Sequence, residues 1–267
     1  MPTGLRLRLS ILLTAFTFVP ASAALAQQPF RVDDAEVAPH KQWQLETNLE
    51  WDKLRASAAP YRWQAVADAE VAFGVAPRLQ VSAVVPFMAL ARSDRFGRHT
   101  DIGLSDVSFG AKYRLTKNPT AATSYAVSLD VELPTGSHRR GLGSSLTDVS
   151  TNVVWQHHLN SRWTLRGNAG VVFAGNTQTG LLGLRERGTM VTSGASVTTT
   201  PSPRLLLGAE VSGIWSGKES IGDSYVQWQL GGNVLLRQGL TLDLGLLGGH
   251  SDASPVVGVQ IGCTLAL

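Results

Sequence analysis

The sequence predicts an all-β chain that crosses a membrane as an antiparallel up-and-down β-barrel of about 12 strands. Residues 41–53 alternate strictly between apolar and polar side chains, and Trp43 and Trp51 stand at the two ends of the apolar set. A period of two is typical of a strand, because successive side chains point to opposite faces. A transmembrane strand takes about 9–11 residues and has aromatic side chains at both membrane interfaces. The same pattern recurs along the chain, and the repetition favours a barrel.

The first residues read as an export signal. Arg6 and Arg8 precede an apolar run over 9–19, and Ala24-Leu25-Ala26 has the small-x-small form of a cleavage site. We therefore expect residues 1–26 to be a signal peptide and the protein to reach the bacterial outer membrane. Residues 27–40 are expected to be a short periplasmic leader, too short for a plug domain, and residues 41–267 to be the barrel.

Composition narrows the class of partner. The formal net charge is +3, and loss of the two signal-peptide arginines leaves a nearly neutral chain, which argues against nucleic acid. The single cysteine, Cys263, excludes an intramolecular disulfide. Its place in the alternation favours a small hydrophobe on an apolar strand face over a reactive thiol.

The remaining strands follow in order from the same alternation. Turn residues such as Pro77, Pro119, Asn160 and Pro201 separate them, as turn chemistry predicts. The run over 191–200, made of Thr, Ser and Val, is the weakest. The expected strands cover 43–51, 61–75, 79–87, 103–115, 124–133, 149–157, 163–173, 191–200, 205–215, 226–236, 240–246 and 257–265.

Long and short connections alternate between these strands. The long ones are expected at 91–101, 135–146 and 176–188, and smaller loops at 54–60, 217–223 and 251–254. Long loops outside and short turns in the periplasm are typical of outer-membrane barrels. A secreted soluble β-sandwich is the alternative, but its strands are shorter and its outward face is polar.

The polar strand faces supply candidate lumen-lining residues, and acidic ones predominate. These candidates are Glu46, Glu50, Arg62, Asp68, Glu70, Asp106, Lys112, Arg114, Asp130, Glu132, Asp148, Arg166, Glu210 and Asp243. The candidate extracellular loops are instead basic, with Arg92, Arg95, Arg98, Arg139, Arg140, Arg185 and Arg187. The wall charges fit either a conduit for cations or hydroxyl-bearing solutes, or a filled interior of paired charges. The loop arginines fit contact with outer-leaflet lipopolysaccharide phosphates better than substrate capture.

Several stretches resemble the outer-membrane proteins of the "MetA-pathway of phenol degradation" family, often named transporters. They are residues 103–115, 132–136, 141–148, 168–170 and 175–176. The resemblance implies an outer-membrane β-barrel that passes small hydrophobic or aromatic compounds, and it implies no catalytic residues. Barrels of this kind usually end in an aromatic residue that helps the barrel-assembly machinery, whereas this chain ends in Leu265-Ala266-Leu267.

The function expected from the sequence is therefore a channel or transporter for a small-molecule solute. A closed structural or adhesive barrel is the alternative, and an outer-membrane enzyme is a weaker one, since no Gly-x-Ser-x-Gly elbow is present. No metal or other cofactor is expected: His157 and His158 are strand neighbours that face opposite ways.

Overall fold

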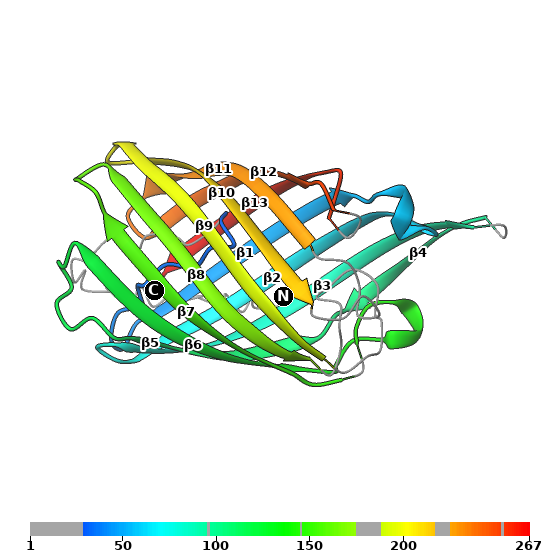
Figure 1. Ribbon diagram of the computed structural model, residues 1–267, viewed down its shortest axis with the longest axis horizontal. Coiled ribbons are helices and arrows are strands. Elements are labelled where there is room, and N and C mark those ends of the chain that lie inside the picture. Colours follow the sequence, from blue (N-terminus) through cyan, green and yellow to red (C-terminus); the bar gives the residue numbers. More distant parts are fainter. Residues whose placement is uncertain (1–28, 95–96, 145, 175–187, 217–224, 252–253) are drawn as a thin grey trace, which may run out of the picture.

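Antiparallel strands close into a barrel in the computed structural model (Figure 1), which describes residues 29–94, 97–144, 146–174, 188–216, 225–251 and 254–267. The strands are β1 (Trp43–Lys53), β2 (Tyr61–Ala76), β3 (Leu79–Asp94), β4 (Gly97–Leu104), β5 (Val107–Arg114), β6 (Thr123–Leu133), β7 (Asp148–His158), β8 (Trp163–Ala174), β9 (Gly188–Ser202), β10 (Leu205–Ser216), β11 (Tyr225–Arg237), β12 (Leu240–Gly249) and β13 (Val257–Ala266). Two 3-10 turns, η1 (Ala56–Ala58) and η2 (His138–Arg140), lie in connections.

Closure comes from β1, which pairs with β2 on one side and with β13 on the other. β4 and β5 both pair with β3, β4 along 87–94 and β5 along 79–84, so the two share one position in the wall. The wall therefore has the 12 strand positions that the sequence predicts.

The outer face of the barrel is apolar. Leu129 in the middle of β6 is 49% exposed, whereas Ala126 on the inner face of the same strand is fully buried. Aromatic rings pair on the outside near both ends of β1: Trp43 lies 4.6 Å from Phe73, and Trp51 stacks on Trp63 at 4.2 Å. An apolar belt with aromatic girdles is the surface that a bilayer selects. This arrangement confirms the predicted outer-membrane β-barrel.

The connection expected at 91–101 is mostly strand. The ends of β3 and β4 pair from Ala91 with Thr100 to Asp94 with Gly97, and the hairpin projects beyond the barrel (Figure 1). Its sequence is polar because water reaches both faces of a projecting ribbon, and strand pairing satisfies its backbone without an apolar face. Polarity alone therefore misidentified it as a loop.

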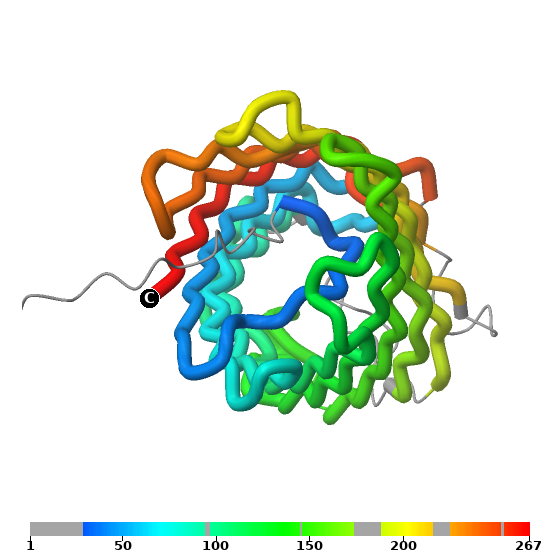
Figure 2. The backbone as a smooth tube through the Cα atoms, turned by 90° about the vertical axis from the view of Figure 1, so that its left-hand side faces the viewer, coloured from blue at the N-terminus to red at the C-terminus, as the bar shows by residue number. Residues whose placement is uncertain are grey.

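The segment that precedes β1 lies inside the barrel and not outside it (Figure 2). Val32 and Ala35 are fully buried, and Phe30 is 3% exposed. We call residues 29–38 the lumenal segment. It begins deep in the barrel and leaves near Gly74, with which His40 forms a bridge. A periplasmic leader was expected here, because the segment has no periodicity that predicts contact with the wall.

Residues 1–28, with the expected signal peptide, lie outside the described part of the chain, as do most of the connections expected at 176–188 and 217–223. Within the described ranges, no helix has the length and apolar character needed to cross a membrane.

Candidate functional site: the barrel lumen

Most of the candidate lumen residues lie on the inner face of the wall. Glu46, Glu50, Asp106, Lys112, Arg114, Asp148, Arg166, Glu210 and Asp243 are buried there. Asp68, Glu70, Asp130 and Glu132 share the inner face and are half-buried. The alternation of each strand places all of them there except Asp106, because a residue with outward-facing neighbours must face the lumen. Asp106 lies in the break between β4 and β5.

Arg62 differs from the expectation and is exposed near the start of β2, which begins at Tyr61. The β2–β3 register steps from Tyr61 opposite Arg92 to Trp63 opposite Ala91, so Arg62 sits in a bulge. A bulge adds an unpaired residue and interrupts the alternation, which the sequence pattern does not reveal.

Carboxylates of the lumenal segment pair with the basic residues of the wall. Lys112 Nζ lies 2.6 Å from Asp33 and 3.3 Å from Asp34. Arg114 lies 2.6 Å from Glu36, and Arg166 lies 3.9 Å from Asp34. Each of these three buried cations therefore faces a carboxylate of the segment, as a buried charge requires.

The inner part of the segment binds acidic and amide side chains of the opposite wall. Arg31 donates to both carboxylate oxygens of Glu50, at 2.6 and 2.8 Å. Glu210 accepts hydrogen bonds from the backbone N–H groups of Arg31 and Val32, each at 2.9 Å. Gln229 Nε2 donates to the Pro29 carbonyl at 2.5 Å. These contacts fix the segment across the lumen.

Three inward-facing glycines make room for the segment. A Cβ at Gly194 would lie 2.6 Å from Val32, one at Gly208 would lie 2.8 Å from Phe30, and one at Gly231 would lie 2.7 Å from Pro29. These contacts are shorter than a Cβ normally makes, so a larger residue at any of the three positions would push against the segment. At Gly208 and Gly231 a Cβ would also meet wall carbonyls, at 2.8 Å from Val197 and 2.6 Å from Leu244, so glycine serves the packing of the strands there as well.

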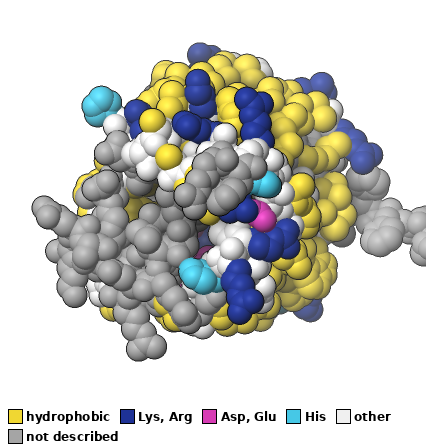
Figure 3. Space-filling model, turned by 90° about the vertical axis from the view of Figure 1, so that its right-hand side faces the viewer, with side chains coloured by type: hydrophobic (Ala, Val, Ile, Leu, Met, Phe, Trp, Pro, Cys, Tyr) yellow, Lys and Arg dark blue, Asp and Glu magenta, His cyan; other side chains and the backbone are white. Residues whose placement is uncertain are grey.

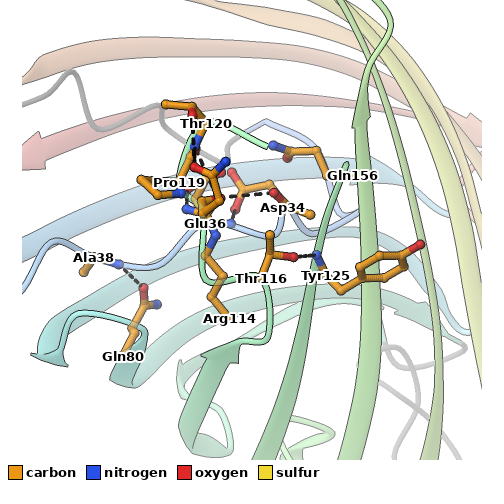
Figure 4. A network of polar contacts seen from close by, with 12 residues as sticks. Asp34, Glu36, Ala38, Gln80, Arg114, Thr116, Pro119, Thr120, Tyr125 and Gln156 are labelled. Atoms are coloured by element: carbon orange, nitrogen blue, oxygen red, sulfur yellow. Dashed lines mark hydrogen bonds and ion pairs between the residues drawn. The ribbon is translucent and has the colours of Figure 1, made fainter. Parts of the chain in front are cut away.

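At the opposite end of the segment, Arg114 ties it to a turn of the barrel (Figure 4). Arg114 contacts Glu36 and also donates to the Pro119 carbonyl at 3.2 Å and to Ser124 Oγ at 3.2 Å. The Ala38 N–H donates to Gln80 Oε1 at 2.7 Å. This end of the segment is therefore held by β3 and β5, and β6 contacts Arg114 in turn.

The rest of the inner wall keeps an excess of carboxylates. Glu46 and Glu70 stand directly opposite each other on β1 and β2, and Glu132 stands opposite Asp148 on β6 and β7. Among described residues, no basic side chain lies within ion-pair distance of Glu46, Asp68, Glu70, Asp130, Glu132 or Asp243. The basic wall residues are neutralised by the segment, and these acidic ones are not.

The end with the long connections is rich in Lys and Arg around a recess (Figure 3). Arg98 and Arg139 are exposed there, while Arg92 and Arg140 approach Asp101 at 3.7 and 3.5 Å. Arg95, Arg185 and Arg187 lie outside the described residues.

Sequence reasoning missed the partners that the segment supplies, above all Arg31, Asp33, Asp34 and Glu36. Two signals could have found them. The leader carries three carboxylates in a chain whose inner wall has three unmatched cations, and glycine interrupts the inner faces of three adjacent strands. Within the described ranges, no group of acidic, histidine or cysteine side chains has the geometry of a metal site.

Solved outer-membrane barrels share this fold. The COG4313 outer membrane channel from Pseudomonas putida F1 superposes with a TM-score of 0.69 at 14% identity, over 88% of this chain and 98% of that chain. The KdgM porin gives a TM-score of 0.55 at 8% identity, over 83% and 98% of the two chains. The β domain of the Bordetella autotransporter BrkA gives 0.53 at 11% identity, over 85% and 100%. At such identities these likenesses establish the fold alone.

A search of curated proteins found no match. The model of one protein family matches residues 38–266, nearly the whole of the barrel and the end of the lumenal segment. The match agrees with the resemblance noted from residues 103–115 and 132–136. This chain belongs to the family described as "Putative MetA-pathway of phenol degradation".

Proposed function

We propose that this protein is an outer-membrane channel for small molecules, in which the lumenal segment narrows an acidic conduit. One observation carries the proposal. The inner wall bears carboxylates that are half-buried and have no described cation within reach, such as Glu70 and Asp130. Charges of one sign without partners are costly in a dry interior, so these groups favour a water-containing lumen.

The acidic wall favours cations and solutes that donate hydrogen bonds over anions. Like charges on a confining wall raise the local concentration of the opposite ion. The family description and the fold, which channels and porins share, are consistent with uptake of small hydrophobic or aromatic compounds. Outer-membrane lipid, lipopolysaccharide and the barrel-assembly machinery remain expected partners.

A closed structural barrel is the second candidate, and the lumenal segment favours it. The segment fills part of the interior. It joins β1, β5, β8 and β10 by contacts that involve a charged side chain, and β3 by the hydrogen bond from the Ala38 N–H to Gln80. The two candidates differ in whether solutes pass while the segment stays in place.

Solute uptake by liposomes decides between them. The mature chain and a variant lacking residues 27–38 are reconstituted, and swelling is followed in an uncharged pentose and in an uncharged disaccharide, neither of which crosses the lipid readily on its own. A narrowed channel passes the pentose in both forms and passes the disaccharide faster after the deletion. A closed barrel passes neither solute in the full-length form.

A further inference from the structure

A compact apolar cluster lies on the inner wall at the extracellular end of the lumen. We call Leu54, Tyr61, Val66, Met88, Leu90 and Leu142 the mouth cluster. Leu90 is fully buried, Leu142 is 1% exposed, and Met88 is 4% exposed. On the same strand, Val85 and Phe87 face lipid and are 43% and 47% exposed. Met88 and Leu90 have the opposite parity along the strand and therefore face inward. Apolar side chains on the inner wall of a polar lumen need an apolar occupant to shield them from water.

That occupant is the side chain of Leu142, which comes from a loop and not from the wall. Leu142 is the one large apolar side chain between residues 135 and 144. Gly141 adopts φ 72°, and the Leu142 N–H donates to the Ser137 carbonyl at 3.0 Å, so the chain turns Leu142 into the mouth.

Asp106 anchors the two ends of this loop. Its carboxylate accepts hydrogen bonds from the Gly136 N–H at 2.8 Å and from the Ser144 N–H at 2.7 Å. Leu142 lies six residues after the Gly136 anchor and two residues before the Ser144 anchor, so the loop can stay tethered to the wall while Leu142 moves out of the cluster.

A polar group with an unused acceptor adjoins the cluster. Gln64 stands directly opposite Leu90 on the inner face of β2, and it is 8% exposed. Its Nε2 donates to Asp52 Oδ2 at 2.9 Å, whereas its Oε1 has no hydrogen-bond partner among the described residues. A buried acceptor without a partner is costly, and a ligand with an O–H group would satisfy it.

We propose that the mouth cluster is the first binding site for a monocyclic aromatic solute with a hydroxyl group, whose ring replaces Leu142 and whose hydroxyl donates to Gln64 Oε1. An apolar cavity of about 150 Å³ made by truncation of a core side chain binds benzene, so displacement of a leucine opens space of the right order. The inference rests on the proposed channel function. It assigns the recognition step to the mouth, ahead of the acidic wall.

Methionine NMR reads this site directly. After removal of residues 1–26 the chain keeps two methionines, Met88 in the mouth cluster and Met190, which packs with Val172 on the inner wall of β8 and β9. The refolded mature chain carries a ¹³C-methyl label on methionine and is titrated with phenol and with toluene. The expected result is a saturable shift of the Met88 resonance, with Met190 unaffected, and a preference for phenol of about three- to tenfold, the range of one hydrogen bond.

Two variants and one control test the named residues. L142A removes the internal occupant and strengthens phenol binding by about tenfold, a change of the size expected for loss of part of a buried leucine contact. Q64L abolishes the preference for phenol over toluene. L104A, a truncation of a lipid-facing leucine on β4 at 51% exposure, leaves the affinity unchanged. Heat-modifiable migration in SDS gels verifies that each variant is folded.

Equal and non-saturating shifts of both methyl groups, or an affinity that L142A leaves unchanged, overturn the inference and leave the mouth cluster as a loop anchor. Pentose uptake by liposomes is measured on the same preparations. Uptake without a Met88 response contradicts the binding site while the channel stands, and a saturable Met88 response without uptake supports the site while the channel fails.

Discussion

Replacement of Lys112 by methionine should release the lumenal segment. Lys112 holds Asp33 and Asp34 at 2.6 and 3.3 Å, and its side chain is 9% exposed. Methionine has a similar length and no charge, so it keeps the packing and leaves two buried carboxylates without their main partner. Arg166, 3.9 Å from Asp34, is then the nearest remaining cation of the described wall.

The size of the expected effect follows from the burial of Lys112 and its carboxylate partners. Removal of one partner of a buried ion pair costs about 3–5 kcal/mol, because the other charge stays buried. Each 1.4 kcal/mol is about tenfold in an equilibrium constant. The population with the segment outside the barrel should therefore rise by about 100-fold or more.

Trypsin provides the assay, since cleavage after Arg31 requires that the segment leave the lumen. The rate of cleavage follows the open population when opening is fast. Cleavage is measured by mass spectrometry on the folded barrel and is normalised to cleavage after Arg98, which is exposed on the projecting hairpin. The double variant K112M/D33N removes one stranded charge and should return the rate to within about tenfold of the natural chain.

An Arg31 cleavage rate that K112M leaves unchanged, on a barrel that is still folded, would refute the reasoning. It would mean that the ion pairs with Lys112 contribute little to the position of the segment. A rate that rises equally in K112M and in K112M/D33N would locate the effect in lost packing and not in the stranded carboxylate.

Three further perturbations test the register, the fit of the segment and the tether of the loop. L129R should destabilise the barrel by about 2–4 kcal/mol, because Leu129 faces lipid in mid-strand, whereas S128R should be tolerated on the inner face. Equal losses of stability in the two variants, measured by urea unfolding from lipid vesicles, would contradict the register. G194A places a Cβ 2.6 Å from Val32, and its other near neighbours are side-chain atoms. It should speed cleavage after Arg31 without any change of charge; a rate equal to that of the natural chain would show that the segment does not need this space. D106A removes a charged acceptor of two backbone hydrogen bonds, each of which contributes about 1.5–3 kcal/mol. It should raise the rate of amide hydrogen exchange over residues 136–144 by at least about tenfold. An unaltered exchange rate would show that the loop is anchored elsewhere.

The wall of the barrel could be predicted because its signal is local. Alternation along one strand decides which side chains face lipid, and it placed Leu129 outside and Glu46, Lys112 and Asp243 inside without any tertiary information. Strand positions were predictable for the same reason. Arg62 was misplaced because a bulge interrupts the alternation at one residue.

The lumenal segment could not be predicted from such a local signal. Its contacts join residues far apart in the chain: Arg31 and Glu210 are 179 positions apart, and Lys112 and Asp33 are 79 apart. The segment has no repeat, and its polar composition is also typical of an exposed leader. Only the match between its carboxylates and the cations of the wall distinguishes the two, and that match depends on three-dimensional placement.

The central claim is that an acidic lumen conducts and that the segment limits it. Single-channel conductance of the refolded mature chain in a planar bilayer, under a salt gradient, tests this claim most directly, with the variant that lacks residues 27–38 measured alongside. We predict stepwise conductance with a reversal potential whose sign shows that cations pass more readily than anions. We also predict larger conductance steps from the shortened variant. Folded barrels that stay silent in both forms, or that prefer anions, would contradict the account.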